Sequence, residues 1–341
     1  MGYRPFHRII SATENSRSIV PVSCLILPLL GVSAQCSNRH MDLHELRASI
    51  ARHARPDQTT AIDGVLLSKV EQPAPPSTTM SGTVFALIAQ GAKRLALGDR
   101  VYEYRAGQYL IASVDLPVIG HFMEARPEDP ALGFGLTLHS STVAELLLQA
   151  GPGDFSRADS GAPSGIAVSD ASDDLIDAVV RLLRLLDQPR DVAILAPLIK
   201  REILWRLITG DQGAAVRQLG LADSSLAQVA RAVRWIRDHY TQPFRVEDVA
   251  ALAAMSVSAF YRNFQAVTAM SPIQFQKQIR LQEARLLLAT HPHDDTGVGH
   301  RVGYDSPSQF SREYRRQFGA PPSQDAAHLR SSTLSPAMPL P

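Results

Sequence analysis

Cysteine is scarce in this chain, and its placement is restricted. The 341 residues contain two cysteines, Cys24 and Cys36, both within the first 40 positions. The rest of the chain therefore cannot form a disulfide or a cysteine-ligated zinc site. This absence suits a reducing compartment and predicts a cytoplasmic location.

A long unbroken hydrophobic run is also missing. The apolar stretch over residues 19–34 is interrupted by Pro21 and Pro28, and it is shorter than the ~20 residues that a membrane helix needs. Met41 starts a cleaner amphipathic helix, so we expect translation to begin there and residues 1–40 to be a non-native or disordered extension. No membrane partner is expected, and a tether through residues 19–34 is the weaker alternative.

The chain has little net charge, with 34 Lys and Arg against 33 Asp and Glu. The charge is unevenly divided: residues 41–222 hold 17 basic against 22 acidic side chains, a net of −5, and residues 223–330 hold 13 against 10, a net of +3. A mild positive balance predicts modest non-specific affinity for nucleic acid. The arginines of the C-terminal part therefore matter through their placement.

Between residues 60 and 138 short apolar segments alternate with turn residues. Segments 84–90, 93–98, 100–113 and 116–125 are predicted to be β-strands. Gly98-Asp99 and residues 105–108 are predicted to close hairpins, with a further tight turn at Gly91. Several short strands with no helix between them favour a small β-barrel or a double-sheet jelly roll.

Helical patterns follow the strands. A helix with a serine or threonine cap is expected over residues 140–150, and Ser172 is expected to cap a second helix. Three aspartates lie near the start of that second helix: Asp173, Asp174 and Asp177. A cap and helix-dipole role accounts for them better than acid–base chemistry does. A third helix, over residues 191–209, has an apolar face wider than one partner helix needs, which predicts a homodimer.

The sequence GYDSPSQFSREYRRQFG, residues 303–319, is typical of the turn and second helix of a helix-turn-helix. Phe310, Tyr314 and Phe318 recur every four residues and predict one buried face. Short polar side chains and arginines occupy the other faces. Such groups read base edges and neutralise phosphates in a major groove.

A second unit of this kind lies about 50 residues upstream. Residues 246–254 and 258–268 predict two helices joined by a turn, with Leu252 facing inward and Ser258 as the cap. Residues 272–290 predict a connecting helix of roughly 28 Å at 1.5 Å per residue, close to the ~34 Å of one DNA turn. Two reading helices on one chain are therefore expected to enter successive major grooves.

Residues 225–322, above all GYDSPSQFSREYRRQFGAPP, resemble the DNA-binding domain of the AraC/XylS family of bacterial transcription regulators. The resemblance implies base reading by Ser258, Tyr261 and Arg262 in the first unit and by Ser308, Gln309 and Arg312 in the second. By their chemistry, Arg315 and Arg316 are expected, like Arg262 and Arg312, to anchor phosphates or guanine edges. The sequence TGVGHRVG at 296–303 departs from the family pattern. Its interior glycines cost roughly 1 kcal/mol each relative to alanine and predict a short or frayed helix.

Residues 89–130 are similar to the N-terminal sensor domain of one subgroup of the same family, a cupin-like barrel. The resemblance implies that the barrel holds a small-molecule effector, as small barrels can, and no effector-binding residue is singled out. Tyr102, Tyr104 and Tyr109 either line such a pocket or serve as core and rim aromatics.

The alternative function is a cupin-type metal-dependent enzyme with an accessory helical domain. Such enzymes hold their metal with a His-x-His pair, a glutamate and a distant histidine. Here His121 stands alone, with Glu124 three residues on and His139 further along the chain. We therefore expect no metal, no cofactor and no catalytic residue, and hence no enzyme.

The whole sequence predicts an α+β protein, with an N-terminal cupin-like β-barrel and helical hairpin and a C-terminal all-α domain of two helix-turn-helix units. The expected boundaries are 41–210 for the sensor and dimerisation domain, 211–223 for a linker, 224–325 for the DNA-binding domain and 326–341 for a disordered tail. The expected function is transcription regulation on promoter DNA, as a homodimer, with RNA polymerase and a small-molecule effector as partners. Activation and repression both fit this organisation.

Overall fold

The computed structural model describes residues 42–73, 76–150, 164–290 and 295–331. The predictions made for Cys24, Cys36, Met41 and residues 1–40 lie outside these residues. Among the described helices, none combines the length and the apolar character needed to cross a membrane.

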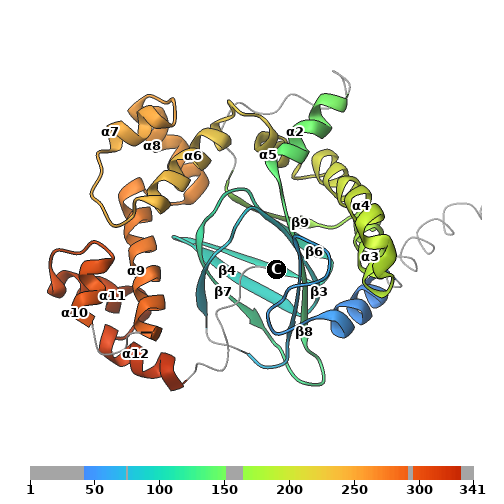
Figure 1. The fold of residues 1–341 in the computed structure, drawn as a ribbon, viewed down its shortest axis with the longest axis horizontal. Coiled ribbons are helices and arrows are strands. Elements are labelled where there is room, and N and C mark those ends of the chain that lie inside the picture. The colour runs from blue at the N-terminus through green and yellow to red at the C-terminus, as the bar shows by residue number, and fades with distance from the viewer. Residues whose placement is uncertain (1–41, 74–75, 151–163, 291–294, 332–341) are drawn as a thin grey trace, which may run out of the picture. The chain divides into compact units, whose positions relative to one another are not determined.

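Two antiparallel sheets form the N-terminal part (Figure 1). The larger sheet has the strand order β1 (Val65–Val70), β8 (Ala131–Thr137), β3 (Val84–Gln90), β6 (Gln108–Ala112) and β9 (Ile166–Asp170). The smaller sheet has the order β2 (Ser77–Met80), β7 (Pro117–Met123), β4 (Ala92–Leu97) and β5 (Arg100–Arg105). The predicted fold class, a two-sheet β domain followed by helices, is confirmed.

The larger sheet is buried on both faces. Phe85 and Tyr109 belong to a core shared with helices, whereas Ala86 and Leu110, one residue along each strand, belong to the core between the two sheets. Burial on both faces explains why β3 is a continuous apolar run and not an alternating one. Tyr104 lies in the core between the sheets, on the opposite side of the larger sheet from Tyr109.

One of the two predicted hairpins is correct. Gly98-Asp99 joins β4 to β5, with Leu97 opposite Arg100 in the ladder. The hairpin predicted at residues 105–108 is wrong, because β6 pairs with β3 and β9 and the chain crosses to the other sheet at this turn. The reason is burial: β5 is mostly exposed and suits a sheet edge, whereas β6 is buried on both faces and needs a partner strand on each side.

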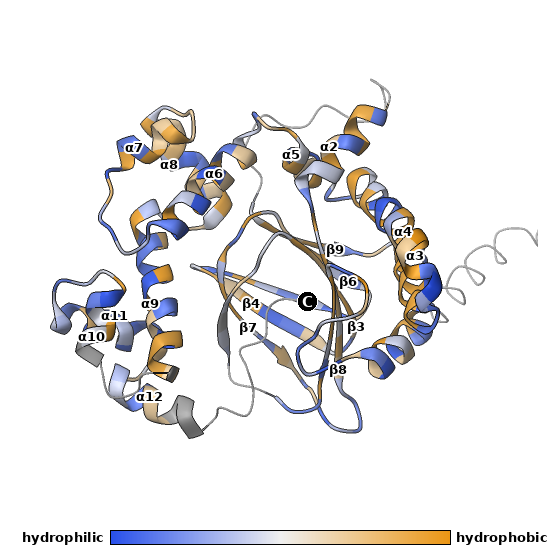
Figure 2. Cartoon of the chain, viewed as in Figure 1, coloured by the Kyte–Doolittle hydropathy of each residue, from blue (hydrophilic) through white to orange (hydrophobic). Residues whose placement is uncertain are grey.

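Helices cover the outer face of the larger sheet. They are a helix over residues 42–53, α2 (Ser140–Gln149), α3 (Asp173–Arg184), α4 (Pro189–Thr209) and α5 (Gly213–Gly220). Figure 2 shows hydrophobic residues along α3 and α4. Ser172 caps α3 as predicted, with its Oγ accepting from the Leu175 N–H at 3.3 Å. The cap predicted for α2 is wrong, since His139 holds that position without a side-chain hydrogen bond.

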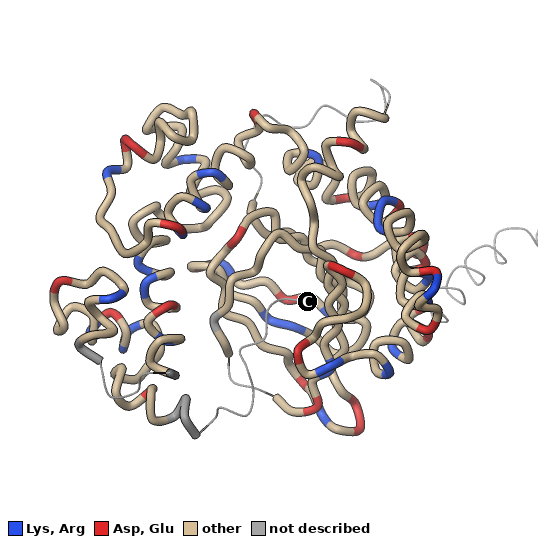
Figure 3. The backbone as a smooth tube through the Cα atoms, in the orientation of Figure 1, with Lys and Arg blue, Asp and Glu red and all other residues tan. Residues whose placement is uncertain are grey.

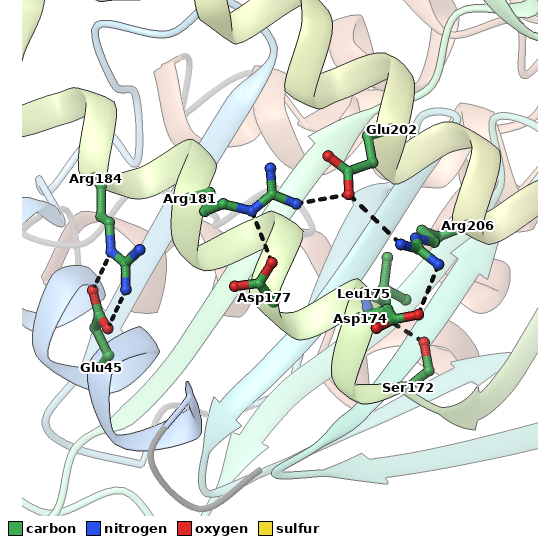
Figure 4. A network of polar contacts seen from close by, with 9 residues as sticks. All are labelled: Glu45, Ser172, Asp174, Leu175, Asp177, Arg181, Arg184, Glu202 and Arg206. Carbon is green, nitrogen blue, oxygen red and sulfur yellow. Dashed lines mark hydrogen bonds and ion pairs between the residues drawn. The ribbon is translucent and has the colours of Figure 1, made fainter. Parts of the chain in front are cut away.

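Ion pairs join α3 to α4 and to the first helix (Figure 4). Arg181 bonds Asp177 at 2.8 Å and Glu202 of α4 at 2.7 Å, and Arg206 of α4 bonds Asp174 at 2.7 Å. Arg184 donates two hydrogen bonds to Glu45, at 2.6 and 2.7 Å. Asp174 and Asp177 therefore have ion-pair partners, and Asp173 and Asp174 lie in the first turn of α3, where the helix dipole favours acidic side chains.

The C-terminal part is helical throughout. Its helices are α6 (Ser225–Asp238), α7 (Val246–Leu252), α8 (Val257–Thr268), α9 (Pro272–Thr290), α10 (Asp295–Arg301), α11 (Pro307–Phe318) and α12 (Pro322–Ser331). The predicted connecting helix coincides with α9. Phe275 and Ile279 in its first half pack with α6, α7 and α8, whereas Leu281 and Leu288 in its second half pack with α10, α11 and α12. Each half of α9 thus belongs to one helix-turn-helix unit.

The end of α8 contacts the β domain. The Gly165 N–H donates to the Val267 carbonyl at 3.0 Å, and Arg237 of α6 pairs with Asp115. A Cβ on Gly98, at the β4–β5 turn, would lie 2.9 Å from the Ala269 carbonyl oxygen. The turn that ends the inner strand β4 therefore lies directly against the end of the first reading helix.

Candidate nucleic-acid interface

The first helix-turn-helix unit consists of α7 and α8. Ala254, in the turn between them, has a positive φ of 56°. The helix cap is Ser256, whose Oγ accepts from the Ala259 N–H at 3.3 Å, so the prediction of Ser258 as the cap is wrong by two residues. Leu252 was expected to face inward but is 47% exposed, because α7 ends there and the apolar contact is made by Val249 instead.

The predicted readers of the first unit lie on the exposed side of α8. Ser258, Tyr261 and Arg262 are all exposed, and Tyr261 retains 43% of its surface. Their spacing of three and four residues places them on one helical face. Phe260 and Phe264 are completely buried on the other side. The packing of α8 therefore fixes the helix and leaves the three predicted side chains free to contact a partner.

The second unit consists of α10 and α11. Ser306 caps α11, with its Oγ 3.4 Å from the Gln309 N–H, and Pro307 occupies the first turn. Gly319 ends the helix in the left-handed conformation at φ 81°. Phe310 and Tyr314 are buried, as their spacing predicted.

Four of the five predicted site residues in the second unit lie at the surface. Ser308, Arg312, Arg315 and Arg316 are exposed, and Gln309 is half-buried. Within the described part of the chain, no hydrogen bond or ion pair is recorded for the guanidinium groups of Arg262, Arg312, Arg315 and Arg316. Their charges are therefore available for an anionic partner. Figure 3 shows further basic residues along α6 and α9.

A carboxylate that the sequence analysis did not single out positions α11. Glu313 Oε1 accepts from Lys277 of α9 at 2.8 Å and from Gln309 at 3.2 Å, and its Oε2 accepts from the Tyr304 hydroxyl at 2.9 Å. Burial raises the pKa of Glu313, but these hydrogen bonds outweigh it and hold the pKa below its ordinary value. The position of Glu313 four residues after Gln309 was the available signal.

Glycine has a packing role in α10. The short, frayed helix expected from the glycines is found as a helix over Asp295–Arg301. A Cβ on Gly299 would lie 3.1 Å from Cδ1 of Phe310. Glycine here permits close approach of α10 to the aromatic side of α11, and that contact offsets the low helix propensity.

Arg280 of α9 joins the two units. Its guanidinium donates to the carbonyls of Tyr240 at 2.6 Å and Thr241 at 3.2 Å, between α6 and α7, and to the carbonyl of Gly303 at 2.7 Å, at the turn before α11. Gly303 lies so close that a Cβ would be 2.2 Å from the Thr241 carbonyl oxygen. One side chain thus fixes the segment between α6 and α7, and the turn between α10 and α11, to the connecting helix.

The metal site considered for the β domain is tested by how its histidine and carboxylate side chains are arranged. Among the described residues there is no group of three or more His, Cys, Asp and Glu side chains that could hold a metal ion. His121 lies in β7 opposite Arg94 of β4. Burial, followed by the Arg94 charge, lowers the pKa of His121.

Comparison with known proteins agrees with this organisation of a two-sheet domain followed by paired helix-turn-helix units. The family model of the AraC-type transcriptional regulator N-terminus matches residues 61–215, and a helix-turn-helix domain model matches residues 249–327. The chain belongs to the AraC/XylS family of transcriptional regulators.

Individual relatives are distant. The chain is 28% identical to the HTH-type transcriptional activator RhaS of Klebsiella pneumoniae (strain 342) over 121 residues. This matched stretch covers 35% of this chain and 42% of RhaS. The chain spans about half the length of the curated relatives it matches. A crystal structure of apo ToxT from Vibrio cholerae has a TM-score of 0.51 at 12% identity and covers 80% of this chain and 100% of ToxT. ToxT bound to (E)-4-(8-methylnaphthalen-1-yl)but-3-enoic acid has a TM-score of 0.50 at 10% identity, covering 78% of this chain and 100% of ToxT.

Proposed function

We propose that this protein is a sequence-specific DNA-binding transcription regulator controlled by a small molecule bound in its β domain. The observation that carries the proposal is the pair α8 and α11. Each helix buries aromatic side chains on one side. On the other side α8 presents Arg262 and α11 presents Arg312, Arg315 and Arg316, none with a recorded partner among the described residues, and α9 connects the two helices. Arginines on exposed helices are suited to phosphates and guanine edges.

The individual roles are assigned by chemistry. Arg262, Arg312, Arg315 and Arg316 contact phosphates or guanine edges, while Ser258, Tyr261, Ser308 and Gln309 set register and base choice. The amide of Gln309 is already held by Glu313, so it presents its carbonyl oxygen in a fixed direction. The proposed DNA surface is two successive major grooves of a promoter. The proposed location is the cytoplasm, and the proposed protein partner is RNA polymerase.

Each domain is assigned a role within the boundaries expected from the sequence. Residues 41–210 sense the effector and dimerise, residues 211–223 join the domains through α5, and residues 224–325 bind DNA, with residues 326–341 as a tail that begins within α12. Support for dimerisation comes from α4, where Ile194 is 70% and Leu198 59% exposed. Support for small-molecule control comes from ToxT, which has a similar fold and was crystallised with an organic acid. No enzymatic activity is proposed.

A gel-shift titration tests the DNA-binding proposal. The probe is a promoter fragment enriched from genomic DNA by the wild-type protein. Arg312→Ala is expected to lose about 1–3 kcal/mol of specific binding, with a smaller effect on unrelated DNA. Arg190→Ala is the matched control, since Arg190 is exposed on α4 outside the DNA-binding region.

Two results of this titration would contradict the proposal. One is the same operator affinity for Arg312→Ala and for the Arg190→Ala control. The other is failure of the wild-type protein to enrich any fragment over bulk DNA.

A further inference from the structure

A lysine lies on the inner face of the smaller sheet. Lys93 of β4 retains 5% of its surface, and Leu95 and Leu97, two and four residues on, belong to the core between the sheets. Because side chains alternate along a strand, Lys93 faces the same core. Within the described residues no hydrogen bond or ion pair is recorded for its ammonium group, and its contact is with the ring of Phe122, with Nζ 4.7 Å from the ring centroid.

A second unpaired polar group lies beside it. Tyr104 of β5 is directly opposite Lys93 in the ladder and is completely buried. Its hydroxyl has no hydrogen-bond partner among the described residues. Phe122 is opposite Lys93 on the other neighbouring strand, β7. Three adjacent strands therefore place a phenol, an ammonium group and an aromatic ring in one row facing inward.

The surroundings of this row are apolar. The core between the sheets, to which Tyr104 and Phe122 belong, also contains Ala86 and Ile88 from β3 and Leu110 and Ala112 from β6 of the larger sheet. Burial alone lowers the pKa of Lys93 to about 7, because no acidic group is near enough to stabilise its charge. A buried polar group without a partner destabilises the fold, so methionine would suit this position better in the empty protein.

We propose that the Lys93 ammonium and the Tyr104 hydroxyl bind the carboxylate of a small monocarboxylic acid, whose apolar part packs against the inner faces of both sheets. This inference rests on the proposed function, since it names the effector class and its site. Both side chains have donor hydrogens and lack an acceptor. One positive charge in an apolar interior matches one negative charge, whereas a phosphate dianion would bring an uncompensated charge into the core.

The proposed pairing makes binding depend on pH. The charged or titratable groups nearest Lys93 on neighbouring strands are Tyr102 and Tyr104; Arg94 and Glu103 pair with each other on the outer face, where His121 also lies. A bound carboxylate favours the protonated lysine, so binding takes up a proton above the pKa of the empty site. Affinity is therefore constant just below neutral pH and falls by up to about tenfold per pH unit above it.

Calorimetric titration of the full chain with hexanoate and octanoate tests the site, with 1-hexanol and 1-octanol as neutral probes. The acids are expected to bind the wild-type protein and the alcohols are not. Lys93→Met and Tyr104→Phe are each expected to weaken binding at least about tenfold, the lower end of the range for hydrogen bonds to charged groups. Lys69→Met is the matched control, since Lys69 pairs with Glu71 at the surface.

The inference is overturned if neither acid binds the wild-type protein, or if Lys93→Met and Tyr104→Phe bind the acids as the wild type does. Should Lys93→Met fail to fold, the wild-type pH series and Tyr104→Phe still decide, because an acid affinity that is flat from pH 6 to 9 contradicts pairing with Lys93.

Operator binding by the same proteins separates this inference from the proposed function. If the wild-type protein binds specific DNA but neither acid, the carboxylate site is contradicted and the proposed regulator function is not. If the protein binds the acids through Lys93 but shows no specific DNA binding, the carboxylate site is supported and the proposed regulator function is contradicted.

Discussion

The energetic cost of an unpaired charged side chain differs between the surface and the interior of this protein. Among the described residues, Arg262 and Arg312 have no recorded partner on the surface, where solvent screens their charge. Lys93 has none in the interior, where solvent screens little. The cost of an unpaired charge therefore differs greatly between the two domains. A buried lysine without a recorded partner among the described residues destabilises the fold, so we attribute Lys93 to function.

Substitution of Lys93 is expected to change how stability depends on pH. The pKa of Lys93 is lowered to about 7 in the folded protein from an ordinary value of 10.5. Between these values the unfolded state binds more protons than the folded state, so the free energy of unfolding rises with pH. Relative to Lys93→Met, the wild type should gain stability from about pH 7 to pH 10.

Urea denaturation of both proteins across that pH range measures this difference. Lys69→Met again serves as the control, and its difference from the wild type should not change with pH. A constant difference between the wild type and Lys93→Met would contradict a depressed lysine pKa.

Gly299 is expected to resist replacement although it lies in a helix. Alanine would gain helix propensity of roughly 1 kcal/mol, but its Cβ would lie 3.1 Å from the Phe310 ring. That ring is buried between Tyr304 and Tyr314 and cannot give way. Gly299→Ala should therefore destabilise the protein by about 1–3 kcal/mol, measured by thermal unfolding.

A double-mutant cycle checks the cause of this effect. Adding Phe310→Leu to Gly299→Ala should recover part of the loss, because the smaller side chain makes room for the new methyl group. Strictly additive effects of the two substitutions would show that the contact is not responsible.

At the scale of elements, α9 decides how the two reading helices are held. Its first half packs with one helix-turn-helix unit and its second half with the other. Arg280, near its middle, bonds the segment before α7 and the turn between α10 and α11. The relative placement of α8 and α11 therefore depends on one helix and a small number of hydrogen bonds.

Arg280→Ala is expected to loosen this connection. It would remove the Arg280 donor from the carbonyls of Thr241 and Gly303, while Gln276 still donates to the Tyr240 carbonyl, at a cost of about 1–3 kcal/mol. Hydrogen exchange should rise around residues 240–241 and around the turn at Gly303. Operator affinity should fall more than affinity for unrelated DNA, because two-site recognition needs fixed spacing. Arg234→Ala, at an exposed position of α6, is the control, and equal exchange in both variants would contradict the role of Arg280.

At the scale of the whole molecule, the exposed apolar face of α4 predicts self-association. Ile194 and Leu198 are four residues apart and together form an apolar strip. Leu198→Glu should weaken a dimer at least about tenfold, as truncation of a central interface anchor does. Leu148→Glu on α2 is the control, since Leu148 is exposed and lies on another helix.

Sedimentation velocity of the full chain over a range of concentrations measures this effect. The dimer proposal fails if the wild type sediments as a monomer at micromolar concentration. It also fails if both variants associate like the wild type.

Local sequence was sufficient for much of the fold. Strand β3 and helix α9 were predicted with the ends that they have, because a continuous apolar run and a helical period between turn signals are local properties. The buried face of Phe310 and Tyr314 followed from spacing in the same way. The exposed readers of α8 and α11 were then the residues left on the opposite faces.

Pairing and contact between distant segments needed the tertiary structure. The turn at residues 105–108 was recognised, but only the folded protein decides that β6 leaves β5 for β3 and β9, since strand partners are chosen by burial on both faces. Lys93 and Tyr104 look like ordinary strand residues until the second sheet removes them from water. The sequence by itself determined which faces of α8 and α11 are buried and which are exposed, because that depends on local spacing. The packing of one sheet on another decided which described polar groups the interior leaves unsatisfied, because that depends on distant segments.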